Sequence, residues 1–165
     1  MMNGKIPPQA IEIEESVLGA LLLDQNAITN AIDILRQEYF YLEAHQHIYR
    51  AISILFRDGN PVDLLSVADQ LKKDGRFDEI GGLTKLVSLT NRITSAAHIE
   101  YHVRILSEKY IQRELIRVST ETLKDSYDDT VDVLNLLDRT ETKFLEINDS
   151  NFKSDFHSMD VLLSN

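Results

Sequence analysis

The sequence of 165 residues contains no cysteine and no tryptophan, and only three prolines and six glycines. Without cysteine the chain has neither a disulfide framework nor a thiolate metal site, which is compatible with a reducing compartment. Long apolar runs are also missing: the longest, Val17 to Leu23, is far shorter than the roughly 18 residues that a membrane span needs. Because this run has neither the basic flank nor the cleavage site of a signal peptide, we expect a cytoplasmic protein.

Basic residues are scarce as well. Seventeen Lys and Arg stand against 27 Asp and Glu, which gives a formal net charge of −10. Proteins that grip a phosphate backbone present basic patches, and no stretch here reads as a basic arm, so we expect little intrinsic nucleic-acid binding. A hydrophobic content of 43% and a charged content of 27% are typical of one globular domain, or of one small domain with an extension.

Helical spacing of apolar residues runs through the first hundred positions, and no segment alternates as a strand would. The spacing predicts helices over Ile11–Leu23, Asn26–Leu35 and Glu43–Arg57, followed by a compact helical segment over Asn60–Asn91. In that segment Asp63 has the character of an N-cap, and a glycine at position 75 can adopt the left-handed conformation that ends a helix. The acids at positions 12, 14 and 15 occupy the first turns of their helix, where its dipole favours negative charge; a partner contact is the alternative.

The C-terminal third has a different character. Residues 96–125 contain neither Gly nor Pro, which predicts one long helix. A turn is expected at Asp125–Asp129, with Asp129 or Thr130 as the N-cap of a second helix over Val131–Asn148. Apolar residues cover more of both helices than one antiparallel partner can hide, and an exposed apolar patch of that extent marks an interaction site. The hairpin therefore either dimerises by side-by-side helix packing or folds back on the preceding helices.

The apolar residues that we expect to pair are Ile105, Ile116, Leu123, Leu134, Leu137 and Phe144. Charged neighbours are expected to tune partner choice at the rim, namely Arg113, Glu114 and Arg117. The last segment carries an amphipathic pattern in Phe156, Met159 and Leu162 that is too short to be stable alone.

The sequence lacks the common motifs of catalytic and metal sites. The phosphate-binding pattern G-x-x-x-x-G-K-[ST] is absent, so this chain alone is not expected to hydrolyse ATP, and no cofactor site is expected. His45 and His47 lie two positions apart and point to different sides of a helix. His98 and His102 have chelating spacing, but the glutamate of the zinc-protease motif does not follow His98. No calcium loop or serine nucleophile elbow occurs either, and we expect no catalytic or metal-binding residues.

Five stretches together resemble the N-terminal domain of the bacterial replicative DNA helicases of the DnaB family. They are PPQAIEIEESVLGALLLD (Pro7–Asp24), FYLEAHQHIYRAI (Phe40–Ile52), PVDLLSVADQLK (Pro61–Lys72), IGG (Ile80–Gly82) and TSAAHIEYHVRILSEKYIQRELI (Thr94–Ile116). The resemblance covers roughly residues 7–148 and implies an all-α fold, a small globular orthogonal helical bundle followed by a long antiparallel helical hairpin.

The resemblance also implies a function. Similar helicases pair their hairpins into a collar of three dimers in a hexameric ring, and the hairpin binds primase. ATP and Mg²⁺ would then bind in a motor domain that this chain lacks, and a helicase loader would be a further partner. The segment around Phe156 would start the linker helix that docks on a neighbouring motor domain.

We therefore expect a globular helical subdomain at 1–95, a dimerisation and docking hairpin at 96–148, and a linker at 149–165. The sequence leaves two competing classes open. One is an acid–base hydrolase that uses clustered carboxylates, but the acids are scattered over helix ends and exposed faces. The other is an all-helical partner-binding domain of an unrelated regulator, and the long matched pattern argues against it.

Overall fold

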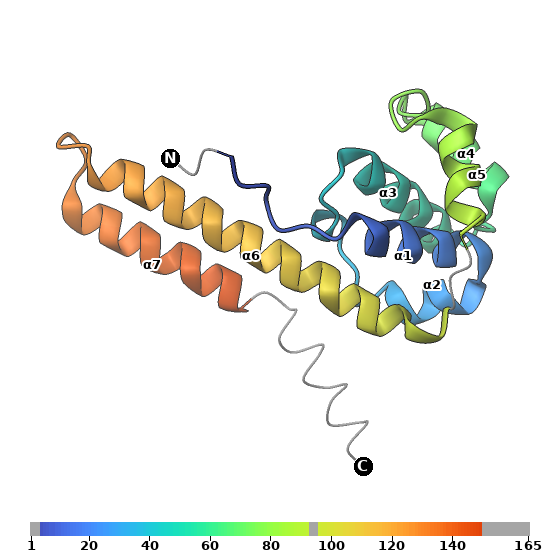
Figure 1. The fold of residues 1–165 in the computed structure, drawn as a ribbon, viewed down its shortest axis with the longest axis horizontal. Helices are drawn as coiled ribbons and strands as arrows, with labels where there is room; N and C mark the ends of the chain where they lie inside the picture. The colour runs from blue at the N-terminus through green and yellow to red at the C-terminus, as the bar shows by residue number, and fades with distance from the viewer. Residues whose placement is uncertain (1–3, 93–95, 150–165) are drawn as a thin grey trace, which may run out of the picture. The chain divides into compact units, whose positions relative to one another are not determined.

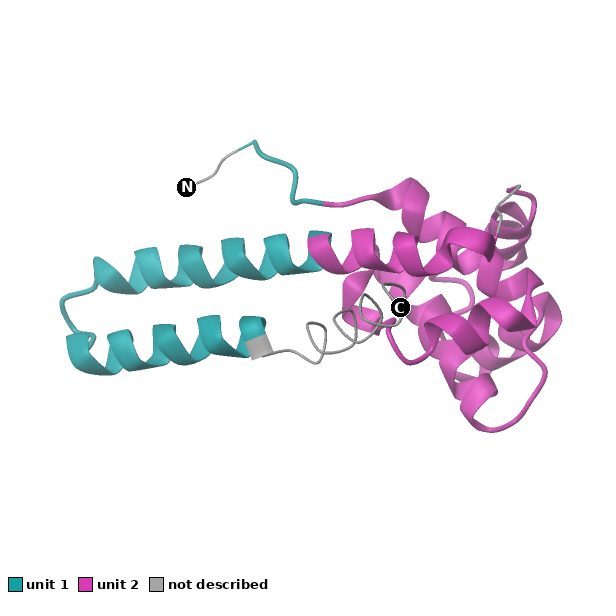
Figure 2. Ribbon diagram, turned by 90° about the horizontal axis from the view of Figure 1, so that it is seen from below, with its two compact units in different colours: residues 1–8, 109–165 teal, residues 9–108 magenta. Residues whose placement is uncertain are grey.

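A computed structural model describes residues 4–92 and 96–149. These residues form seven α-helices and two short 3-10 helices and no strand, which confirms the predicted all-α fold (Figure 1). The chain divides into two compact units (Figure 2). We call residues 9–108 the helical block and residues 1–8 with 109–165 the hairpin unit. The domain boundary predicted after residue 95 stays a prediction.

The helical block is built from the helices that precede α6 and from the first turns of α6 itself. They are α1 (Ile11–Leu23), α2 (Gln25–Ala31), η1 (Gln37–Tyr39), α3 (Glu43–Arg57), α4 (Leu64–Lys73), α5 (Gly82–Thr90), η2 (Ala96–His98) and α6 (Ile99–Ser126). Helix α1 contacts α2, α3 and α5, and α3 also contacts α4. Their facing residues form the core, whose largest members include Phe40, Leu18, Leu21, Ile48, Ile52, Leu71, Leu86 and Leu106.

Helix α4 begins and ends as the sequence predicts. The Asp63 carboxylate accepts the Ser66 amide at 2.8 Å while the Ser66 hydroxyl accepts the Asp63 amide at 2.9 Å, a reciprocal capping box. These hydrogen bonds, first of all the Ser66 amide, hold the pKa of Asp63 below its usual value. After the helix, Gly75 takes a left-handed φ of 69°. Gly81 has φ 100° at the N-cap of α5, where a Cβ would lie 3.1 Å from the Lys85 Cβ.

Three predicted helix ends were wrong. Helix α2 stops at Ala31 rather than Leu35, because the amides of residues 34 and 35 both donate to the Ala31 carbonyl and turn the chain into the core. The long helix is α-helical only from Ile99, after the 3-10 turn η2. Helix α7 (Val133–Asp149) is capped by Asp132, whose carboxylate accepts the Asn135 amide at 2.9 Å, and not by residue 129 or 130.

The hairpin unit contains the rest of α6 and all of α7, which lie side by side and antiparallel (Figures 1 and 2). The turn between them is held by Asp128, whose carboxylate accepts the Thr130 amide at 2.9 Å and its hydroxyl at 2.7 Å. Among the residues that the structure describes, no helix has both the length and the apolar character to cross a membrane.

Candidate functional site

The hairpin unit has a narrow buried seam. Val118 of α6 is fully buried, and the Thr122 and Thr140 hydroxyls lie 3.4 Å apart across the two helices. Beside them, the Lys143 ammonium donates to the Glu121 carboxylate at 2.9 Å. These contacts fix which side of each helix faces the other.

Several other large apolar side chains of the hairpin are exposed to solvent. Leu134 and Leu137 of α7 are 72% and 64% exposed, and Phe144 is 38% exposed. On the α6 side of the hairpin, Leu115, Ile116 and Leu123 are exposed as well. The two adjacent helices thus expose large apolar side chains, a feature that surfaces for partners commonly share.

Helical geometry sorts these residues into faces. At 100° per residue, Leu115 lies about 60° from Val118, and Leu137 and Phe144 lie within about 60° of Thr140. The three offsets have the same sense of rotation about their own helix axes. Because the two helices are antiparallel, offsets of the same sense fall on the same side of the seam. We call this side, with Val133 included, the apolar face; its members are Leu115, Val133, Leu137 and Phe144.

The structure places the other predicted pairing residues elsewhere. Ile116 and Leu123 lie about 100° or more around α6 from Val118 and Thr122, on the side turned away from α7. Leu134 lies on the corresponding outer side of α7. Ile105 is half-buried and belongs to the helical block rather than to the hairpin unit.

The opposite side of the seam is charged. Arg117 donates to the Glu114 carboxylate at 2.7 Å and to Glu121 at 3.1 Å, and Glu121 also receives Lys143. We call these four residues the charged cluster. Its ion pairs, first of all the hydrogen bond with Glu114, raise the pKa of Arg117 above its usual range. The hydrogen bond from Lys143, followed by that from Arg117, lowers the pKa of Glu121.

Of the three predicted rim charges, Arg113 has a different environment. Its guanidinium donates to the Pro8 carbonyl at 2.9 Å and lies 6.0 Å from the centre of the Tyr110 ring. Arg113 is thus engaged with the N-terminal segment of the hairpin unit, while Glu114 and Arg117 belong to the charged cluster. The predicted docking residues Phe156, Met159 and Leu162 lie outside the described residues.

Sequence reasoning missed a buried polar pair in the helical block. Glu14, predicted to be one of three dipole-favoured acids, is fully buried, and its carboxylate lies 2.8 Å from Nδ1 of the equally buried His45. The same carboxylate accepts the Tyr41 amide at 2.7 Å, just before α3 begins. A signal was available, because Glu14 lies three, four and seven positions before the apolar residues Val17, Leu18 and Leu21.

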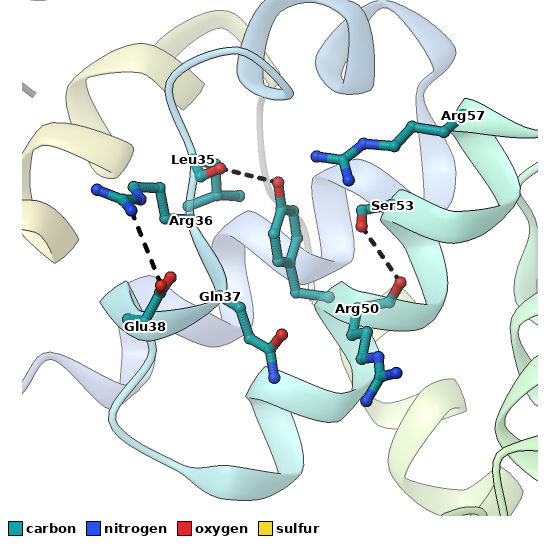
Figure 3. Close-up of a pocket in the computed structure, with 8 residues that line it drawn as sticks. Leu35, Arg36, Gln37, Glu38, Arg50, Ser53 and Arg57 are labelled. Atoms are coloured by element: carbon teal, nitrogen blue, oxygen red, sulfur yellow. Dashed lines mark hydrogen bonds and ion pairs between the residues drawn. The ribbon is translucent and has the colours of Figure 1, made fainter. Parts of the chain in front are cut away.

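A cavity of about 210 Å³ opens beside α3 (Figure 3). Its lining residues include Arg36, Arg50 and Arg57, and also Tyr49, whose hydroxyl donates to the Leu35 carbonyl at 2.9 Å. Burial raises the pKa of Tyr49 to about 12, so its hydroxyl stays protonated. The lining also includes Glu38, whose carboxylate lies 3.9 Å from the Arg36 guanidinium.

The described residues thus define an all-helical class of domain, in which a helical block precedes a hairpin with an exposed apolar face. Comparison with known proteins gives the family. The sequence model described as DnaB-like helicase N terminal domain matches residues 6–108. This chain belongs to that family.

Comparison with individual relatives supports the same family. The chain is similar to the replicative DNA helicase DnaB of Rhodothermus marinus, with 41% identity over 97% of this chain and 17% of that protein. It is similar to the crystal structure of the N-terminal domain of DnaB helicase from Mycobacterium tuberculosis, with a TM-score of 0.81, 34% identity, and coverage of 86% of this chain and 99% of that one.

A third similarity is to a DnaB-like replicative helicase whose structure was solved with its interactions with primase, at a TM-score of 0.69 and 23% identity, covering 86% of this chain and 31% of that one. That identity shows the fold alone. The chain spans 17% to 36% of the length of the curated relatives that it matches.

Proposed function

We propose that this chain is the assembly and primase-docking domain of a bacterial replicative DNA helicase. It takes part in replication initiation and fork unwinding by building the ring and by recruiting partners. ATP hydrolysis, with its Mg²⁺, belongs to a separate motor domain of the whole helicase, which acts in the bacterial cytoplasm. The observation that carries the proposal is the apolar face of the hairpin, because a domain that served only to carry a motor would not leave this surface in water.

The occupant of the apolar face is a second copy of the chain. Burying Leu137 and Phe144 of both copies would gain at most about 6–12 kcal/mol, at about 1.5–3 kcal/mol for each of the four side chains. Association itself costs about 4–15 kcal/mol. These four side chains therefore do little more than offset that cost, and a stable pair must cover most of the apolar face, together with outer residues such as Ile116, Leu123 and Leu134. Three such dimers complete a hexameric ring.

The charged side of the hairpin remains accessible in this arrangement. We assign primase to it, because Glu114 and Arg117 offer ion pairs there that can be exchanged for those of a partner. Exposed ion pairs contribute little to the stability of the chain itself, so they are available for recognition. A helicase loader is a further partner of the assembled ring, and the segment containing Phe156 and Leu162 is proposed to dock on a neighbouring motor domain.

The experiment combines two substitutions on the apolar face, Leu137→Asp with Phe144→Asp. The charges leave the helix content of the chain largely intact and shift its oligomers toward monomer, and the dissociation constant measured by sedimentation equilibrium rises by at least about a hundredfold. Leu65→Asp is the matched control, because Leu65 is 74% exposed on α4 of the helical block. Unchanged assembly in the double variant contradicts the proposal.

A second measurement tests primase docking. Reversing the charges with Arg117→Glu weakens the binding of the cognate primase in isothermal titration, while sedimentation of the variant alone is unchanged. Lys73→Glu, in an exposed ion pair on α4 with Asp69 at 3.2 Å, is the control. Equal loss of primase in both variants would show that net charge, rather than the charged cluster, governs docking.

A further inference from the structure

Three potential metal ligands converge on the surface of the helical block. Glu43 and His47 are one helical turn apart at the start of α3, and Glu79 approaches them from the turn between α4 and α5. The ligand atoms of these three side chains all lie within 4.8 Å of one another. They come from two separate segments of the chain, so the tertiary fold assembles the group.

The imidazole of His47 is the fixed member of the group. Its Nε2 atom is buried and has no hydrogen-bond partner among the described residues. Buried polar nitrogens in proteins normally have a partner, so an unpaired one that points at two carboxylates requires an explanation. The side chain of His47 is 13% exposed, whereas those of Glu43 and Glu79 are 74% and 43% exposed. The two carboxylates can therefore move to bind an ion, whereas the position of the His47 nitrogen is fixed by its surroundings.

The separations within the group are longer than hydrogen bonds. Nε2 lies 3.6 Å from the Glu43 carboxylate and 3.8 Å from the Glu79 carboxylate. Hydrogen bonds between nitrogen and oxygen are about 2.7–3.2 Å long. Ligands that each lie about 2.0–2.2 Å from one tetrahedral Zn²⁺ are about 3.3–3.6 Å apart. The observed distances are closer to the second spacing than to the first.

Arg76 orients one of the carboxylates. Its guanidinium donates to Glu79 Oε2 at 2.6 Å, while it is Oε1 of the same carboxylate that faces His47. Ligating carboxylates in metal sites are commonly held by such an outer hydrogen bond. The two carboxylates and the Arg76 guanidinium together carry one formal negative charge, which favours a cation.

We propose that Glu43, His47 and Glu79 form a binding site for a divalent transition metal. One imidazole nitrogen and two carboxylate oxygens suit Zn²⁺, with water in the fourth position. The bound ion ties the first turn of α3 to the turn between α4 and α5. Its role is to fix these segments of the helical block, and no reaction is assigned to it.

The test is titration of the complete 165-residue chain, freed of metal with a chelator, with Zn²⁺ in a calorimeter and with Co²⁺ followed by visible absorption. We expect one equivalent of each ion to bind, with a Co²⁺ spectrum of four-coordinate nitrogen and oxygen ligation. Glu79→Gln and His47→Gln each lower the Zn²⁺ association constant by at least about tenfold, the loss that removing an outer partner already causes. Circular dichroism of each variant without metal checks that it is folded. Because Glu79 is exposed, Glu79→Gln should remain folded and tests the proposal even if His47→Gln unfolds.

The chain contains its own control. His98, at the end of η2, and His102, in α6, are four positions apart and could bind metal as a pair, so the variant His98→Gln with His102→Gln should retain the one-equivalent binding. Loss of binding in that control alone would assign the metal to the histidine pair and overturn the proposal. Unchanged affinity in Glu79→Gln, or no saturable binding of either ion, would overturn it as well.

Discussion

The two units of this chain treat their apolar residues in opposite ways. The helical block buries its own, from Val17 and Leu18 in α1 to Leu86 and Leu89 in α5. In the described part of the hairpin unit, Val118 is the only apolar residue that is fully buried, while Leu134, Leu137 and their neighbours remain in water. The block thus buries its own core, whereas the hairpin leaves an apolar face exposed, which we propose a second copy of the chain covers.

This difference predicts which substitutions change the stability of the single chain and which change its assembly. Substitutions in the block should change the free energy of unfolding of the single chain, and substitutions on the apolar face should change assembly instead. Metal binding at Glu43, His47 and Glu79 would add to the stability of the block without affecting assembly. The following substitutions separate the two units, in order of decreasing effect.

The largest effect is expected for Phe40→Ala. Phe40 is fully buried and its ring centre lies 5.5 Å from that of Tyr49, so the truncation leaves a cavity and costs about 3–5 kcal/mol. Leu137→Ala, by contrast, should change the unfolding of the dilute monomer by no more than about 0.5 kcal/mol. Urea denaturation of both variants measures the contrast, and equal losses would mean that the hairpin residue is part of a core.

Glu14→Ala should follow closely. It leaves the fully buried His45 and the Tyr41 amide without their acceptor, and breaking a buried pair in this way costs about 3–5 kcal/mol. Glu12→Ala, on the exposed side of the same helix, is the control and should be nearly neutral. Chemical denaturation provides the comparison, and a neutral Glu14→Ala would show that water replaces the lost carboxylate.

Asp63→Ala should cost about 1 kcal/mol, since it removes the capping box of α4. The pKa of Asp63 is lowered in the folded chain, so its contribution is present above the unfolded value of about 3.9 and is lost as the pH falls through the folded value. Thermal unfolding of wild type and variant should therefore differ at pH 7 and converge near pH 2. A constant difference across this range would contradict the assignment to the ionised carboxylate.

The smallest effect belongs to Lys143→Ala in the charged cluster. The ion pair of Lys143 with Glu121 is partly exposed and is screened by salt, so the unfolding midpoint should change less than in Asp63→Ala. Repeating the thermal scan in 1 M NaCl should remove the remaining difference in unfolding midpoint between the wild type and Lys143→Ala. A large, salt-independent loss would indicate a packing role for the lysine stem.

Local patterns in the sequence were sufficient to predict much of the fold. The bounds of α1 and α3, the Asp63 cap and the left-handed glycine at position 75 all depend on residues within one or two turns of each other. The end of α2 was predicted wrongly because tertiary burial of Ile34 and Leu35 tightens the last turn, which propensity does not report. The cap of α7 was misplaced because three nearby residues, Asp129, Thr130 and Asp132, have similar capping chemistry.

The candidate sites show the same limit. That the hairpin carries too much apolar surface was evident from its helical pattern, which also places Leu137 and Phe144 on one face of α7. The pattern did not reveal which side of each helix faces the other, so it did not show that Ile116 and Leu123 lie on the outer side of α6. The position of Glu79 beside His47 could not be predicted at all, because the two residues are brought together only by the packing of separate segments.

The most direct test of the central claim is the mass of the complete chain in solution, measured by sedimentation equilibrium over a wide range of concentrations. We predict a reversible rise from the monomer to at least twice its mass, abolished by Leu137→Asp with Phe144→Asp and retained in Leu65→Asp. A single subunit that stays monomeric at the highest concentration would contradict the claim that the hairpin needs a second copy.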